Sequence, residues 1–190
     1  EEFEGGSAHV LEHMLFKGTK KYPEIGSIAA TVEKAGGDIN AYTTFDHTNY
    51  YLTAPSEFTF AGAELLLDVV QNSLLDEHEL KKELEVVIEE IKRGRDNPNS
   101  IVSQSLFSLA YHGTRLQHPV IGYQNIVEGF TRDIIFNFYK KWYTPNNMVF
   151  IAAGDFDAEK LCQHLENLTQ NFKPVTIPTR DRVAETLFNQ

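Results

Sequence analysis

The sequence predicts an α+β domain in which an antiparallel β-sheet packs against a layer of helices. Segments with strand character are gathered together instead of alternating with helices, so a parallel βαβ arrangement is not indicated. With 190 residues, 42% of them hydrophobic, the chain can bury one substantial core. We therefore expect one domain over residues 1–171. Residues 172–190 contain two prolines and mixed charges, which predicts a tail or linker.

The first half of the chain carries the clearest local signals. A helix is expected over about 6–16, and a second over about 24–35 that ends at Gly36-Gly37. Residues 38–45 and 48–54 are rich in isoleucine, tyrosine and threonine and flank a short polar turn. This composition predicts a β-hairpin.

The second half is predicted to be mostly helical. Its exception is the uninterrupted apolar run 148–153, which predicts a buried central strand. Pro98 is expected to separate two helices because proline cannot continue the helix that precedes it. The helices are expected at about 57–75, 76–95, 99–112, 131–142 and 157–169.

His9 and His13 lie four residues apart on the first helix, so their side chains project from one face and can share a metal ion. At 100° per residue, Glu12 lies about 60° to one side of His9, and His13 about 40° to the other. The remaining residues of this helix are mainly apolar, which predicts that it is buried. A bound cation would offset the cost of burying three ionisable groups together. An ordinary histidine pair that hydrogen-bonds to Glu12 is the alternative.

Two glutamates on the helix over 76–95 could complete a metal site. Glu83 and Glu90 are seven residues apart, so they lie within about 20° of each other and flank the apolar stripe. Glu85 and Glu89 are expected on the solvent side. Glu90 can therefore reach inward as a third ligand, with Glu83 as an acceptor that orients a ligand. Two histidines and one glutamate with one open position are the arrangement of catalytic zinc.

A resemblance to a known family supports this interpretation. Residues 5–19 read Gly-Gly-Ser-Ala-His-Val-Leu-Glu-His-Met-Leu-Phe-Lys-Gly-Thr and resemble the active-site segment of the M16 peptidases, which include pitrilysin, insulinase and mitochondrial processing peptidase. In that family, 76 residues separate the inverted His-x-x-Glu-His motif from a glutamate, and residues 14–89 form an interval of that length before Glu90. Further matches, such as Asn40-Ala41-Tyr42-Thr43 and Tyr143-Thr144-Pro145-Asn146-Asn147-Met148, extend the resemblance to about residue 170.

The resemblance implies an M16 or LuxS-like metallohydrolase half that acts as a zinc-dependent endopeptidase. His9, His13 and Glu90 would hold Zn²⁺. Glu12 would act on the zinc-bound water as general base and then as general acid, with Glu83 in a supporting catalytic role.

The same resemblance implies how a substrate and a partner would bind. A peptide would add by main-chain hydrogen bonds to the strand that carries Asn40, Ala41 and Tyr42, although ordinary strand roles for these residues are the alternative. In the family, strands precede the active-site helix and a second, similar half closes a chamber. We therefore expect the isolated chain to bind zinc but to cleave peptides poorly without a second M16-like half or subunit.

Two other functions are weighed against the peptidase. A non-catalytic scaffold or partner subunit of a two-part assembly is disfavoured because such members generally lose a ligand or the base. A structural zinc module is disfavoured because Glu12 would then be a buried carboxylate without a task. The net charge of −10 argues against nucleic acid as a partner, and the sequence holds no run of 18 apolar residues that would predict a membrane span. No compartment is indicated.

Overall fold

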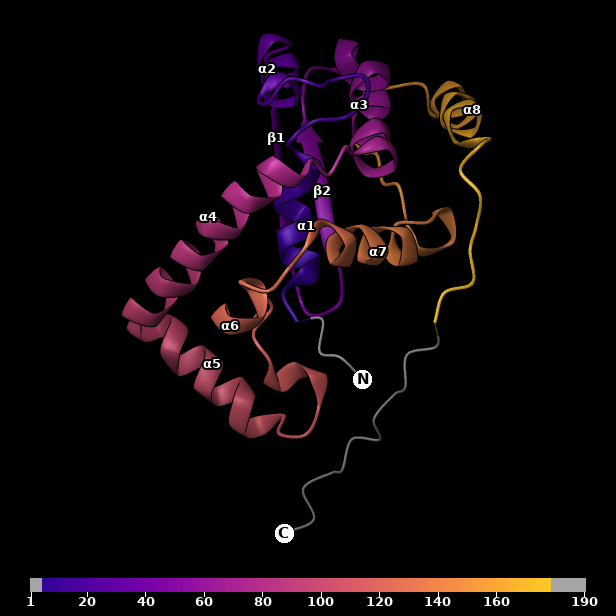
Figure 1. The fold of residues 1–190 in the computed structure, drawn as a ribbon. Coiled ribbons are helices and arrows are strands. Elements are labelled where there is room, and N and C mark those ends of the chain that lie inside the picture. The colour runs from indigo at the N-terminus through magenta and orange to yellow at the C-terminus, as the bar shows by residue number, and fades with distance from the viewer. Residues whose placement is uncertain (1–4, 179–190) are drawn as a thin grey trace, which may run out of the picture.

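The computed structural model describes residues 5–178, which form eight α-helices, three short 3₁₀-helices and one two-stranded antiparallel sheet (Figure 1). This arrangement confirms the predicted α+β class. The helices are α1 (Ser7–Leu15), α2 (Ser27–Lys34), α3 (Thr59–Asn72), α4 (Glu77–Asp96), α5 (Pro98–Ala110), α6 (Gln124–Val127), α7 (Arg132–Trp142) and α8 (Ala158–Thr169), and the 3₁₀-helices are η1 (Ser56–Phe58), η2 (Arg115–Gln117) and η3 (Pro145–Asn147).

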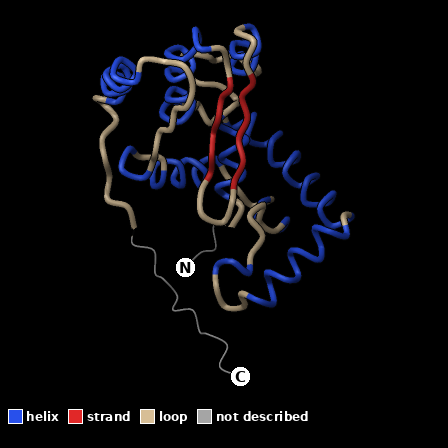
Figure 2. The backbone as a smooth tube through the Cα atoms, turned by 180° about the vertical axis from the view of Figure 1, so that it is seen from behind, coloured by secondary structure: helices blue, strands red, loops and turns tan. Residues whose placement is uncertain are grey.

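The predicted hairpin is present as β1 (Asp38–Thr43) and β2 (Thr48–Thr53), seen as two long adjacent strands in Figure 2. The strands pair antiparallel, with Asp38 opposite Thr53 at the open end and Thr43 opposite Thr48 at the turn. Along β1, every second residue is half-buried, ending with Thr43, and the others are exposed. The alternation places one face of the hairpin toward the helices.

Helix α1 lies at the centre of the structure, where it contacts both strands of the hairpin, α4 and α7. Val10, Leu11 and Leu15 on this helix have no exposed surface. Burying side chains of this kind contributes roughly 1.5–3 kcal/mol each relative to an exposed position. The prediction that the first helix is buried is therefore confirmed.

At the start of α1, the backbone makes a close contact with the backbone at Gly122. Gly6 precedes the helix with a φ of +100°, and Gly122 approaches it with a φ of +84°. A Cβ atom on Gly122 would lie 2.6 Å from the Gly5 carbonyl oxygen and 2.9 Å from the Gly6 Cα. Both positions require glycine, since a side chain would force this contact apart.

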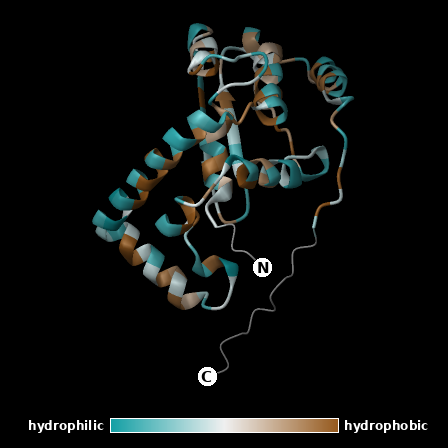
Figure 3. Cartoon of the chain, viewed as in Figure 1, coloured by the Kyte–Doolittle hydropathy of each residue, from teal (hydrophilic) through white to brown (hydrophobic). Residues whose placement is uncertain are grey.

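Helices α4 and α5 form an arm that extends from the rest of the structure and turns back at Asn97, with α6 inside the angle (Figure 1). The Asn97 side chain accepts from the first backbone N–H groups of α5, where Pro98 is the first residue, so the predicted break at Pro98 is confirmed. Helix α4 buries Leu80, Leu84 and Val87, whereas α5 buries no residue and shows several hydrophobic positions in Figure 3.

The central strand predicted over residues 148–153 is wrong. These residues form neither helix nor strand in the structure, and Val149 and Ile151 are 85% and 83% exposed. A backbone forms a strand only when a neighbouring strand accepts its hydrogen bonds, and within residues 5–178 the sheet consists of β1 and β2. The short helix α6 was not expected from the sequence.

Two further expectations concern the tail and the membrane. Of the predicted tail 172–190, residues 172–178 contain no helix or strand, and residues 179–190 lie outside the described part. Between residues 5 and 178, no helix has both the length and the apolar character that a membrane crossing requires.

Candidate metal centre

The structure brings His9, His13 and Glu90 together although they come from different helices. His9 Nε2 and His13 Nε2 each lie 3.7 Å from Oε2 of Glu90. One ligand atom from each of the three residues lies within 4.8 Å of the others. The two histidines project from one face of α1, and Glu90 reaches them from the third quarter of α4.

The spacing and the donor types fit a zinc ion. Ligand atoms that lie about 2.1 Å from a tetrahedral zinc are roughly 3.4 Å apart, which is close to the distances between the Nε2 atoms and Glu90 Oε2. Two imidazoles and one carboxylate leave a fourth position for water or substrate. Burial and the neighbouring His13 lower the pKa of His9 to about 4, so this imidazole is neutral and able to bind a metal at physiological pH.

Glu12 is held beside this group by β1. It is half-buried, and its Oε2 atom accepts a hydrogen bond from the Thr43 hydroxyl at the end of the strand. Burial raises the pKa of Glu12, and the Thr43 hydrogen bond and the nearby His13 partly offset this rise. A carboxylate that is a stronger base than usual suits the acceptance of a proton from water.

Glu83 lies on the far side of His13 from Glu90. Its Oε2 atom is 3.1 Å from His13 Nδ1, and its Oε1 atom is 2.5 Å from the ammonium of Lys17. Glu83 is only 7% exposed, so both oxygens of a buried carboxylate are engaged. An acceptor on Nδ1 fixes the tautomer and the ring orientation that direct Nε2 toward a metal.

The remaining glutamates of α4 lie where the helical angles predict. Glu85 and Glu89 are exposed, and Glu89 forms an ion pair with Lys92 at 2.7 Å. The sequence therefore separates the inward from the outward carboxylates of this helix correctly.

The three predicted substrate-binding residues are consecutive on β1. Asn40 lies opposite Tyr51, Ala41 opposite Tyr50, and Tyr42 opposite Asn49. The backbone N–H of Ala41 donates to Asn40 Oδ1 at 2.8 Å, and the Asn40 and Tyr42 side chains are exposed. This strand borders the metal centre through Thr43, and in the described residues no further strand pairs with it.

Two contacts of the site were missed by the sequence, those of Lys17 with Glu83 and of Thr43 with Glu12. The alternation along the predicted strand could have placed Thr43 on the side of the helices. Lys17 follows the end of α1 and carries no pattern of its own, so only the packing of α1 against α4 reveals its partner.

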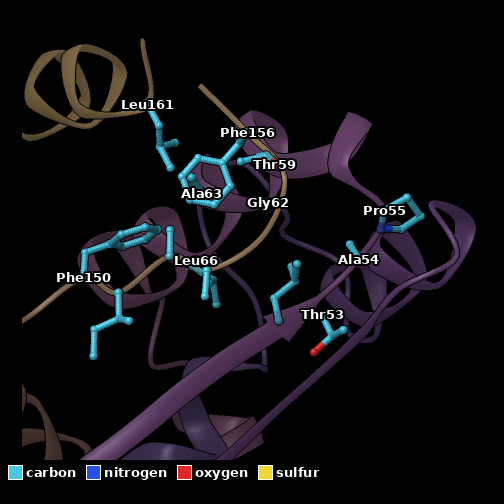
Figure 4. Close-up of a pocket in the computed structure, with 14 residues that line it drawn as sticks. Thr53, Ala54, Pro55, Thr59, Gly62, Ala63, Leu66, Phe150, Phe156 and Leu161 are labelled. Carbon is cyan, nitrogen blue, oxygen red and sulfur yellow. The ribbon is translucent and has the colours of Figure 1, made fainter. Parts of the chain in front are cut away.

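A separate hollow lies at the open end of the hairpin, and no residue of the His–His–Glu group lines it (Figure 4). It is lined by residues 52–55 at and after the end of β2, by α3, by residues 150–153 with Phe156, and by Leu161 of α8. The lining contains no carboxylate, imidazole or thiol, so it offers no chemistry comparable to that of the His–His–Glu group.

Comparison with known families decides the relationship. The model of the insulinase family, peptidase family M16, matches residues 1–124. The chain belongs to the M16 family. A second M16 model, described as the peptidase M16 inactive domain, matches residues 129–189. The predicted family is therefore confirmed, and the His–His–Glu group lies within the first of the two matched regions.

Individual proteins and one solved structure are similar to this chain over most of its length. An uncharacterized zinc protease of Rickettsia felis is 34% identical over 170 residues, which are 90% of this chain and 41% of that protein. Bovine cytochrome b-c1 complex subunit 1 is 31% identical over 94% of this chain and 38% of its own length. The crystal structure of a protease from Helicobacter pylori superposes with a TM-score of 0.88 at 27% identity, covering 93% of this chain and 43% of that one. The chain thus spans about two fifths of the length of these relatives.

Proposed function

We propose that this chain is the zinc-binding catalytic part of an M16 endopeptidase. The observation that carries the proposal is the convergence of His9 Nε2 and His13 Nε2 on one oxygen of Glu90, with Glu12 beside them. The zinc proteases among its relatives support the choice of metal. Zinc held by these residues would polarise the scissile carbonyl and supply a water with a pKa near 7.

The chain's own residues then have separate tasks. Glu12 accepts a proton on its carboxylate and passes it to the leaving amine nitrogen, which makes it the general base and then the general acid. Glu83 holds the ring of His13 through Nδ1. Thr43 fixes one oxygen of Glu12 and leaves the other to face the reacting groups.

We propose that the peptide substrate binds along the edge of β1. An extended substrate would pair with the backbone around Ala41, flanked by the exposed side chains of Asn40 and Tyr42. Main-chain pairing reads little of the substrate's sequence, so side-chain preference would come from neighbouring surfaces. We further propose that a second M16-like half closes over this edge, so that the isolated chain cleaves peptides poorly.

A scaffold function in a larger assembly is the second candidate. It is favoured by the likeness to cytochrome b-c1 complex subunit 1, whose name places that relative in a complex. It is disfavoured by the complete set of Glu12 and the three potential ligands.

Zinc content measured by elemental analysis tests the proposal. About one zinc per chain is expected in wild type and in the matched control Glu89→Gln, which alters an exposed carboxylate one residue away, but little in Glu90→Gln. Glu12→Gln should keep the zinc and abolish any peptide cleavage seen with a second half supplied. Absence of zinc from wild type would contradict the proposed peptidase function and favour the scaffold function.

A further inference from the structure

The ion pair between Lys17 and Glu83 is the contact of the site that the proposed mechanism leaves unused. Lys17 follows the C-terminal end of α1, four residues after His13, and its side chain is 27% exposed. Its ammonium lies 2.5 Å from Oε1 of Glu83, whose side chain is 9% exposed. A lysine just after α1, the helix that carries both histidines, thus reaches across to α4 and contacts a carboxylate that also contacts a potential metal ligand.

The two oxygens of Glu83 have different partners. Oε2 faces His13 Nδ1 at 3.1 Å, and Oε1 faces Lys17 Nζ. A carboxylate bonded at one oxygen can rotate about its terminal torsion, because that torsion is broad. Bonding at both oxygens fixes its plane, and therefore the direction from which it meets the imidazole.

From this geometry we infer that Lys17 is a positioning residue for the metal centre. It holds Glu83 in the orientation that directs His13 Nε2 toward the metal, and it does so without touching the metal or the substrate. The inference rests on the proposed zinc site, and it assigns to Lys17 an effect on metal affinity that acts through Glu83.

The sign of the effect separates this role from simple electrostatics. Lys17 is a cation near a site for a dication, so its charge alone would weaken zinc binding, and its removal would tighten it. A positioning role predicts the opposite result. Loss of a partner that orients a ligand typically lowers metal affinity 10- to 100-fold, so we expect Lys17→Met to bind zinc roughly tenfold more weakly than wild type.

The test is zinc affinity, measured by competition with a chromophoric chelator, so it requires no peptidase activity. Lys21→Met is the matched control, because Lys21 also pairs with a glutamate (Glu64, 3.0 Å) but lies on the surface. It should leave the affinity unchanged. Lys17→Arg, which keeps a cationic donor, should retain more affinity than Lys17→Met.

A double variant shows whether Lys17 acts through Glu83. Glu83→Gln should weaken zinc binding. The double variant Lys17→Met/Glu83→Gln should bind zinc no more weakly than Glu83→Gln alone, because Glu83→Gln has already removed the contact through which Lys17 acts. This double variant also leaves no unpaired buried carboxylate, so it keeps the test valid if Lys17→Met alone unfolds.

The outcomes distinguish the inference from the function on which it rests. If wild type binds no zinc, the proposed function fails and the inference with it. If wild type binds zinc and Lys17→Met binds it equally or more tightly, the inference alone is overturned. Additive losses in the double variant would also overturn it, since Lys17 would then act independently of Glu83.

Discussion

Two apolar segments of this chain lie in opposite environments. On α1, Val10 and Leu11 have no exposed surface, whereas Val149 and Ile151 expose more than four fifths of theirs. Helix α1 is enclosed by the hairpin, α4 and α7, while residues 148–153 pair with no strand that the structure describes. Apolar character therefore predicts that burial is favourable, but the neighbouring elements decide whether it occurs.

The largest test of this contrast is a pair of truncations. Leu11→Ala should lower the free energy of unfolding by about 2–5 kcal/mol, because it removes buried methyl groups and leaves a cavity. Ile151→Ala removes a similar number of atoms from an exposed side chain and should change it by less than about 0.5 kcal/mol. Urea denaturation of both variants measures the difference. Equal losses would show that residues 148–153 are covered in solution.

Alkaline pH tests the packing that covers α1. The hydroxyls of Tyr50 on β2 and Tyr143 after α7 lie 2.7 Å apart, and burial raises the pKa of Tyr143 to about 12. An unfolded tyrosine loses its proton near pH 10, so the stability from this site is complete below pH 10 and falls as the pH rises toward 12. The expected loss is up to about 3 kcal/mol.

Chemical denaturation at a series of pH values measures this loss. Tyr143→Phe should reduce the dependence between pH 10 and 12 but not abolish it, because Tyr50 has a raised pKa of its own. A wild-type stability that does not change over this range would contradict the burial of the pair.

The smallest effect compares two helix caps. Asp76 caps α4 by accepting from two backbone N–H groups of its helix, those of His78 and Glu79, and Asp157 caps α8 by accepting from the backbone N–H of Lys160. Either change to alanine should cost about 1 kcal/mol of helix stability. Helix α8 buries only Leu161, so Asp157→Ala should raise hydrogen exchange within α8 alone, whereas Asp76→Ala should lower the melting temperature of the whole structure. A global effect of Asp157→Ala would show that α8 unfolds together with the core.

Local patterns predicted much of the fold and the placement of the candidate site. The four-residue spacing put His9 and His13 on one face, and the seven-residue spacing put Glu83 and Glu90 on the inner side of α4. These relations follow from helix geometry within a single element, so they are readable from the sequence. The predicted roles of these residues, and of Asn40, Ala41 and Tyr42, are carried into the proposed function for experiment to test.

Relations between elements could not be derived in this way. The contact of Lys17 with Glu83 depends on how α1 packs against α4, and the contact of Thr43 with Glu12 on how the hairpin lies over α1. The fate of residues 148–153 likewise depends on a pairing partner, which periodicity does not specify. Sequence patterns determine on which face of its helix or strand a residue lies, but long-range packing determines which residues it contacts.

The division of the His–His–Glu group between α1 and α4 would link metal binding to folding. His9 and His13 are available as a pair once α1 forms, but Glu90 follows only after the 76 residues 14–89. An ion held by all three would close a chain loop of that length, as a covalent cross-link does. The complete site thus exists only after α4 has packed against α1, so zinc would bind late in folding. A chelator that removed the ion would open this loop and lower the stability of the native chain.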